Sequence, residues 1–346
     1  MEDLHLEDAV ELGRDLGRGN ILGIEPYISA ADYASARALE SKLDGYISEA
    51  KGRGWLGEKT IIVLPEYFGT WLVVADEPKS IFQTDSLAVA EQRLVTHHIF
   101  GFLRQLITAN EKGKLEAAVF RLKAGVMAEA YDSVLSNTAS RHRVTIVGGS
   151  TVLPQPEVHD GKLCAGNGPL FGVTPVYGPG GRAYPDLVLK AYPTNEELPF
   201  MTPASSKALP AFDTPAGRLG ILICADSWFP DCYARLDEMN VDLIAVPSNG
   251  GDPLAWDRAW KGYSGWQMPS DVDASDVRRL TEGEAWRKYA LAGRIGMTKA
   301  RCGANIFIRG QLLDMAGGGG RTTIVNNGDV LRDRTPTGAS LVNVWL

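Results

Sequence analysis

The sequence predicts an α/β fold, because strand-like and helix-like segments alternate from one end of the chain to the other. Short, mainly apolar runs such as 61–64 and 144–147 are typical of strands buried on both faces. Between them, apolar residues at helical spacing, for example over 39–47, predict amphipathic helices. No internal repeat, linker or shift in composition interrupts this alternation, so we expect a single domain over residues 1–346.

The composition is ordinary for a soluble globular protein. Of the 346 residues, 45% are hydrophobic and 22% are charged, and the net charge is −7. A negative net charge argues against nucleic acid or an anionic membrane as a partner. No apolar run approaches the roughly 20 residues that a membrane-spanning helix needs, and the acidic start does not resemble a signal peptide. With no disulfide-type or zinc-type cysteine spacing, we expect a reduced, cytoplasmic protein.

The first half of the chain carries clear helix boundaries. Ser29 and Asp32 form a capping box ahead of the first amphipathic segment, and Gly52 and Gly54 end that segment. The predicted elements of this half are, in order, a strand over 20–28, a helix around 39–47, a strand over 61–64, helices over 85–109 and 126–139, and a strand over 144–147.

Glycine and proline dominate the stretch after Gly149, which we expect to be a loop interrupted by two strands, 171–177 and 186–190. These strands are predicted to form a hairpin that turns at 178–181. The elements expected beyond them are a strand ending at Ile223, a helix starting near Pro230, a strand over 242–247, a long loop over 248–281, a helix near 284–300, a strand over 305–308, a mobile glycine loop over 317–320, and strands over 322–325 and 341–344.

One strand delivers a cysteine to a corner of the chain. The apolar run Leu219–Ile223 ends at Cys224, and Pro230 with Asp231 suits the first turn of the next helix. A thiol at such a corner lies against backbone N–H groups and the positive end of a helix, which both stabilise a thiolate. A lone cysteine after an apolar strand is nevertheless more often a small buried hydrophobic residue.

Two charged residues follow apolar strands in the same way, Glu66 after 61–64 and Lys190 after 187–189. Taken singly, each is more typical of a solvated surface side chain. The carboxyl ends of strands line the ligand crevice of open α/β sheets, so the three groups are expected to meet there. The carboxylate of Glu66 can then take the proton of Cys224, and the ammonium of Lys190 can stabilise the oxyanion that forms when sulfur attacks a carbonyl or nitrile carbon.

These residues and their flanks resemble the nitrilase superfamily of carbon–nitrogen hydrolases. Leu64-Pro-Glu66 is similar to the glutamate motif of that family and Leu189-Lys190 to its lysine motif. The nucleophile motif is matched most closely, by Gly217-Arg-Leu-Gly-Ile-Leu-Ile-Cys224-Ala-Asp226-Ser-Trp-Phe229-Pro-Asp231. The run from Val241 to Asn249 resembles the strand that usually follows. The similarity extends from about residue 20 to the C-terminus.

The resemblance implies a four-layer α-β-β-α sandwich that pairs into homodimers or larger homo-oligomers. It implies that Glu66 is the general base, Lys190 the oxyanion stabiliser and Cys224 the nucleophile, and that no cofactor or metal takes part. Further residues are expected to bind substrate or to support these three. They are Tyr67, Asn249, Trp228, the backbone N–H of Ala225 as a second oxyanion donor, and Glu197 or its rival Glu196 as the glutamate that often follows the lysine.

The sequence also departs from the family pattern. Residues 78–126 resemble an inserted helical segment that covers the site or an interface. Ala225 replaces a bulky aromatic residue and should enlarge the pocket, and Ala-Tyr-Pro follows Lys190 in place of the usual polar-His-Leu. Asp226 stands where true nitrilases generally have glutamate, which favours amide over nitrile hydrolysis.

The remaining candidate residues can have structural roles in place of functional ones. The tryptophans at 71, 228, 256, 260 and 266 either wall a substrate pocket or belong to the core or an interface. His97-His98 falls in a predicted helix without acidic or cysteine partners at ligand spacing, so we expect no metal site there. The glycines at 317–320 lack the Lys-Ser/Thr that completes a phosphate loop.

The sequence therefore predicts a cysteine hydrolase that cleaves the C–N bond of a small non-peptide amide or carbamoyl compound through a thioester. Two alternatives within enzymes use the same three residues, namely nitrile hydrolysis and acyl transfer to an amine. A third alternative is a catalytically silent binding protein with the same fold.

Overall fold

Two six-stranded β-sheets lie at the centre of the computed structural model, which describes residues 4–334 and 337–346. The first sheet has the spatial order β1 (Leu6–Leu12), β18 (Ala339–Trp345), β2 (Asn20–Glu25), β4 (Thr60–Val63), β5 (Thr145–Val147) and β8 (Val176–Tyr177). The second has the order β10 (Ala211–Thr214), β11 (Gly217–Ile221), β12 (Leu243–Ser248), β13 (Cys302–Phe307), β16 (Thr322–Asn326) and β17 (Asp329–Arg334). The central strands β2-β4-β5 and β11-β12-β13 are parallel.

The side-chain alternation of β4 shows how the layers pack. Ile61 and Val63 belong to the same core as residues of β12, whereas Ile62 and Leu64 pack with the helices on the other side. The two sheets also meet at Gly23 of β2, where an added Cβ would lie 2.3 Å from Ile306 of β13. Both faces of the first sheet are therefore buried, as its apolar strands predict.

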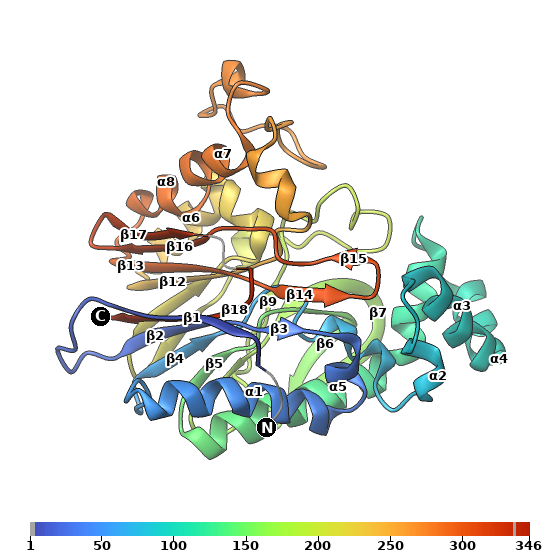
Figure 1. Ribbon diagram of the computed structural model, residues 1–346. Helices are drawn as coiled ribbons and strands as arrows, with labels where there is room; N and C mark the ends of the chain where they lie inside the picture. Colours follow the sequence, from blue (N-terminus) through green and yellow to red (C-terminus); the bar gives the residue numbers. More distant parts are fainter. Residues whose placement is uncertain (1–3, 335–336) are drawn as a thin grey trace.

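Helices cover the outer faces of both sheets, which completes the four-layer α-β-β-α sandwich (Figure 1). α1 (Ala36–Gly52) and α5 (Lys114–His142) pack on the first sheet, while α6 (Pro230–Glu238), α7 (Glu282–Tyr289) and α8 (Leu291–Arg294) lie over the second. Short 3-10 helices connect these elements: η1 (Ala30–Tyr33), η2 (Thr70–Val74), η3 (Ser206–Ala208), η4 (Cys224–Trp228), η5 (Pro253–Asp257), η6 (Ala274–Asp276) and η7 (Ile295–Met297).

Two small sheets extend this body. One joins β3 (Tyr27–Ile28), β14 (Arg309–Leu312) and β15 (Met315–Ala316), and the other joins β6 (Thr151–His159), β7 (Lys162–Thr174) and β9 (Val188–Leu189). The pairing of Leu189 in β9 with Val173 in β7 fixes where the next residue, Lys190, leaves the sheet.

Several sequence-based expectations need correction. The stretch after Gly149 is not mainly loop, because β6 and β7 form a long antiparallel pair. The pairing register shifts between Pro154 and Pro156, where Gln155 of β6 lies opposite residues 166–169 of β7, and the pairing continues on either side of this irregularity. The capping box of Ser29 and Asp32 caps η1, whereas Ser35 caps α1.

The helices also differ from the prediction in their boundaries. The helix predicted over 85–109 is broken at His98 into α3 (Leu87–His97) and α4 (Ile99–Thr108), and the one predicted over 126–139 is the second half of α5. The helix predicted near 284–300 is interrupted at Ala290, whose backbone is not helical. The strands β1, β10, β14, β15 and β17 were not predicted, since they are short or lie at sheet edges.

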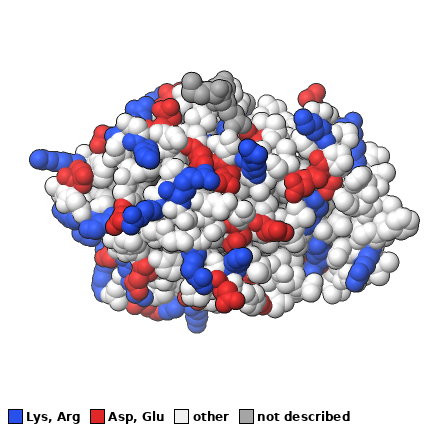
Figure 2. Space-filling view, turned by 90° about the horizontal axis from the view of Figure 1, so that it is seen from below, with Lys and Arg blue, Asp and Glu red and all other residues white. Residues whose placement is uncertain are grey.

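Residues 78–126 comprise α2 (Lys79–Phe82), α3, α4 and the first part of α5, and α2–α4 stand at one side of the sandwich (Figure 1). A largely apolar cavity of about 450 Å³ lies between them and the body, bordered by Trp71, Phe82, Leu94 and Phe120. On the side that carries α1 and α5, acidic and basic side chains are interspersed (Figure 2). Among the described residues, no helix is long and apolar enough to cross a membrane.

The glycine loop at 317–320 is held by a buried arginine and not free as expected. Arg309 donates hydrogen bonds from Nη1 to the carbonyls of Gly318, Gly319 and Gly320, at 2.8, 3.2 and 3.0 Å. Its Nη2 lies 2.7 Å from Oε1 of Glu25, and both side chains are fully buried. Glu25 thus joins the first sheet to the loop that leads into β16.

We predict that Glu25→Ala lowers the free energy of unfolding by about 3–5 kcal/mol, because it leaves the Arg309 guanidinium buried without its counter-ion. Glu58→Ala is the matched control, because Glu58 is 71% exposed and pairs with the exposed Arg143; it should change stability by less than about 1 kcal/mol. Urea unfolding of both variants measures the difference. Equal losses in the two variants would contradict this account.

Candidate active site

Cys224 lies at a sharp corner between β11 and η4. Its backbone φ is +49°, a left-handed conformation that non-glycine residues seldom adopt, so the surrounding structure must hold it. Two local bonds do so, since Ser227 Oγ donates to the carbonyl of Cys224 at 2.7 Å and the N–H of Asp226 donates to the carbonyl of Ile223 at 3.0 Å. The corner predicted from the sequence is therefore present, and it aims the thiol out of the strand.

Asp226 ties this corner to the lysine strand. Its carboxylate accepts hydrogen bonds from the backbone N–H groups of Ala191 and Tyr192, at 3.0 and 2.8 Å, and from that of Ile223, at 3.2 Å. Burial raises the pKa of Asp226 to about 7. Through these bonds Asp226 positions the backbone that follows Lys190 relative to Cys224, and the preference for amides over nitriles stays a prediction.

Glu66 follows β4 after Pro65 and is almost completely buried. The next residue, Tyr67, has a φ of +64°, so the chain turns sharply beyond Glu66. The N–H of Tyr67 donates to Ser150 Oγ at 2.8 Å, and its hydroxyl donates to Glu197. The left-handed residue is thus Tyr67, next to Glu66, at one strand end and Cys224 itself at the other. Both backbones are strained, and the fold holds them in place.

Lys190 joins the acidic residues of the site. Its Nζ lies 2.6 Å from Oε1 of Glu66 and 2.8 and 2.7 Å from the two carboxylate oxygens of Glu197, and none of the three side chains is more than 4% exposed. The N–H of Thr194 also donates to Glu197, at 2.7 Å. Of the two glutamates with suitable spacing, Glu197 is the one beside the lysine, whereas Glu196 is exposed.

Burial governs the protonation of this site. It raises the pKa of Glu66, although Lys190 opposes the effect. Burial, reinforced by the charge of Glu66, raises the pKa of the Cys224 thiol well above its usual range. Burial disfavours the charged form of Lys190, but Glu197 and Glu66 outweigh it and keep the pKa of Lys190 well above its usual range. Burial therefore favours a neutral thiol, whose hydrogen bond goes to the carbonyl of Asn249, over the stabilised thiolate that the sequence analysis expects.

A pocket of about 770 Å³ opens above Cys224. Glu66 and Lys190 lie in its wall, and of the residues expected to bind substrate, Tyr67, Ala225, Trp228 and Asn249 do so as well, whereas Glu197 lies behind Lys190. The carbonyl of Asn249 lies 3.8 Å from the Cys224 sulfur. The structure thus gathers in one pocket residues that are far apart in the chain.

Aromatic side chains form the opposite wall of this pocket. Trp256 and Trp260 lie there with Trp228, whereas Trp71 borders the cavity under α3 and Trp266 donates its indole N–H to the carbonyl of Pro193. The sequence analysis missed further wall residues, among them Lys261, Tyr263, Glu282 and Trp286. The signal for Trp286 was its place in an amphipathic helix, but which face of that helix meets the pocket depends on the tertiary fold.

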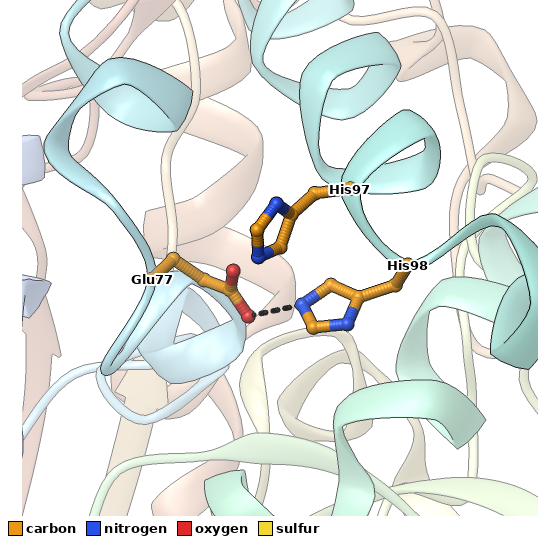
Figure 3. A group of neighbouring side chains, drawn as sticks. All are labelled: Glu77, His97 and His98. Carbon is orange, nitrogen blue, oxygen red and sulfur yellow. Dashed lines mark hydrogen bonds and ion pairs between the residues drawn. The ribbon is translucent and has the colours of Figure 1, made fainter.

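Glu77, His97 and His98 form a separate cluster (Figure 3). The helix break at His98 lets two consecutive imidazoles approach one carboxylate, and Nε2 of His98 lies 2.8 Å from Oε1 of Glu77. These histidines therefore do have an acidic partner, contrary to expectation. The same oxygen pairs with the buried Lys123, which a metal ion would have to displace. We interpret the cluster as an anchor between α5 and the α2–α4 segment.

We predict that Glu66→Gln lowers the pKa of Cys224, because the thiolate is then no longer repelled by a carboxylate. Peptide-resolved mass spectrometry of iodoacetamide labelling across pH measures the midpoint, which should fall by on the order of one pH unit. Cys302 in the same protein is the control, since it is buried at the start of β13 in the other sheet, burial and Arg301 determine its pKa, and its midpoint should not move. An unchanged or higher midpoint for Cys224 would refute this electrostatic picture.

Comparison with known proteins places this fold in a family. The chain resembles an amidase from Nesterenkonia sp. at 15% identity, with 95% of this chain and 90% of that chain aligned and a TM-score of 0.54. Two variants of the Nesterenkonia AN1 amidase also have TM-scores of 0.54 at 14% identity: one described as a nitrilase-superfamily amidase (95% and 92% aligned), the other in complex with butyramide (95% and 91%).

At these identities the likeness to solved structures establishes the fold alone. No curated protein sequence matches this chain at a significant level. The sequence model of the carbon–nitrogen hydrolases, however, matches residues 33–271, which include Glu66, Lys190 and Cys224. The resemblance found in the motifs is thereby confirmed, and the protein belongs to the carbon–nitrogen hydrolase family, as an enzyme with a nitrilase-superfamily fold.

Proposed function

We propose that this protein hydrolyses the C–N bond of a small non-peptide amide or carbamoyl compound through a thioester on Cys224. The observation that carries the proposal is the buried contact of one ammonium with two carboxylates, one of which lines the same pocket as the Cys224 thiol. Such a group can move a proton and stabilise an oxyanion without a histidine or a metal.

In the first half of the reaction, the carboxylate of Glu66 takes the thiol proton while sulfur attacks the amide carbon. The electron pair of the C=O bond moves to oxygen, where Nζ of Lys190 and the N–H of Ala225 stabilise the charge. Because the proton moves from sulfur to Glu66, the total charge of the buried side chains does not change. Loss of the thiol proton to solvent would instead add a buried negative charge, which is costly. The C–N bond then breaks, and the departing nitrogen takes the proton from Glu66.

In the second half, Glu66 takes a proton from a water molecule, and the resulting oxygen nucleophile attacks the thioester carbon. The C–S bond breaks, the acid leaves, and the proton returns to sulfur. Glu197 has a positioning role in this scheme, because it holds Lys190 from the side opposite Glu66 and is itself held by Tyr67 and Thr194. One of the similar solved structures is an amidase variant in complex with butyramide, which supports an amide as the substrate class.

A cytoplasmic location and assembly into homodimers or larger homo-oligomers belong to the same proposal. α4 presents exposed apolar side chains, Phe100 at 88% and Ile107 at 82% exposure, which a second copy could cover. The single-domain organisation and the inserted character of residues 78–126 likewise stay predictions.

We predict that Cys224→Ala lowers the hydrolysis of amides at least about 10³-fold without loss of the fold, because the nucleophile is removed. Ammonia release from a panel of amides, carbamoyl compounds and nitriles measures the activity, and analysis of the acid or amide products separates hydrolysis from acyl transfer. Cys302→Ala, in β13, is the matched control and should retain the parent rate. Turnover of amides by Cys224→Ala at the parent rate would disprove the mechanism.

A further inference from the structure

The wall that faces Cys224 is built from aromatic rings that contact one another. The Trp228 ring lies 5.0 Å from that of Trp286, 5.6 Å from that of Tyr263 and 5.8 Å from that of Trp260, measured between ring centroids. Trp286 in turn stacks on Trp256 at 5.4 Å. Offset and edge-on arrays of this kind accept a further ring at their surface, since the same face and edge preferences apply to a ligand.

Backbone hydrogen bonds hold this wall in place. The hydroxyl of Tyr263 donates to the carbonyl of Trp228 at 3.0 Å. At the neck of the loop that carries Trp260 and Tyr263, the N–H of Trp260 donates to the carbonyl of Leu280 and the N–H of Arg278 donates to the carbonyl of Trp260, both at 2.8 Å. A ring that enters the pocket therefore meets a surface that is already formed, which lowers the entropic cost of binding.

The two ends of the pocket suit different parts of an amide. At one end the buried carboxylate of Glu66 and ammonium of Lys190 suit the NH₂ and C=O groups, and an apolar substituent on nitrogen would be forced against buried charges. Toward the other end, Ala225 leaves room beside the sulfur, and the aromatic wall begins at Trp228. An apolar group on the acyl carbon is thus directed toward the rings.

Two ionisable side chains, Glu282 and Lys261, line the aromatic part of the pocket and interact with each other. Burial raises the pKa of Glu282 to about 7, and the indole N–H of Trp286 donates to its carboxyl group. The ammonium of Lys261 would repel a cationic ligand there, whereas a neutral ring requires no ionised partner. The aromatic end is therefore better matched to an uncharged ring than to an ammonium group.

We infer that the substrate is a primary carboxamide whose acyl group carries an aromatic ring, bound against Trp228, Trp256 and Trp286. This inference rests on the proposed function for the identity of the reacting bond, but the ring site itself is a binding site that can be tested without turnover. Aromatic contacts distinguish a phenyl ring from a saturated ring of similar size, which fills the same space without the π-face.

The test measures binding to the Cys224→Ala protein by calorimetry with phenylacetamide, cyclohexylacetamide and acetamide. Phenylacetamide should bind about two- to tenfold more tightly than cyclohexylacetamide, and both more tightly than acetamide. A second change, Trp286→Leu, should remove the preference for phenyl, and Trp286→Phe should restore part of it. Trp345→Leu is the matched control, because Trp345 lies in β18 outside the pocket and should leave all three affinities unchanged.

Equal or tighter binding of cyclohexylacetamide, or an unchanged preference in Trp286→Leu, would overturn the inference. Ammonia release by the parent protein separates it from the proposed function. If the parent hydrolyses acetamide and phenylacetamide at equal rates, the C–N hydrolase function stands and the aromatic specificity fails. If Cys224→Ala prefers phenylacetamide but the parent releases no ammonia from any amide, the ring site stands and the proposed function fails.

Discussion

The site depends on one buried ammonium between two carboxylates. Removing Lys190, Glu66 and Glu197 from water is costly, and the cost is offset only because Nζ of Lys190 lies within 2.8 Å of oxygens from both acids. Loss of any partner would leave a buried charge uncompensated, which typically costs about 3–5 kcal/mol. The folded chain therefore has to bring the ends of β4 and β9 and the turn after Lys190 into contact at once.

Much of the architecture serves this requirement. Pairing of β9 with β7 sets the exit of Lys190, and Asp226 links that exit to the corner at Cys224 through three backbone hydrogen bonds. The left-handed backbones of Tyr67 and Cys224 are strained, and the fold must supply the stabilisation that keeps them. Strain at these two positions aims the carboxylate and the thiol into one pocket.

The sequence made the fold class and the family predictable because their signals are local. Apolar runs that end in Glu66, Lys190 or Cys224 can be recognised without any knowledge of packing, and the motifs around them match a known family. Proline-containing strands were missed, because the register shift that accommodates them depends on the partner strand. The neutral state of the Cys224 thiol was also missed, because it follows from burial, which no local pattern reports.

The aromatic wall shows the same limit. Trp228 could be named from its place beside the nucleophile, but Trp286 comes from a helix some sixty residues later whose orientation only the tertiary structure sets. In the proposed mechanism the reacting groups lie at strand ends, whereas the inferred ring site lies in segments with little motif character, the loop over 248–281 and α7. Residues at strand ends could therefore be named from local sequence, whereas the place of Trp286 in the pocket could not.

The central claim is that Cys224 becomes acylated during turnover. Rapid acid quenching of the parent protein with excess amide, followed by intact-mass and peptide mass spectrometry, tests it directly. The account predicts a mass increase equal to the acyl group, located on the peptide that contains Cys224 and absent from Cys224→Ala. Amide hydrolysis with the acyl group on another residue, or equal turnover when Cys224 is blocked, would contradict it.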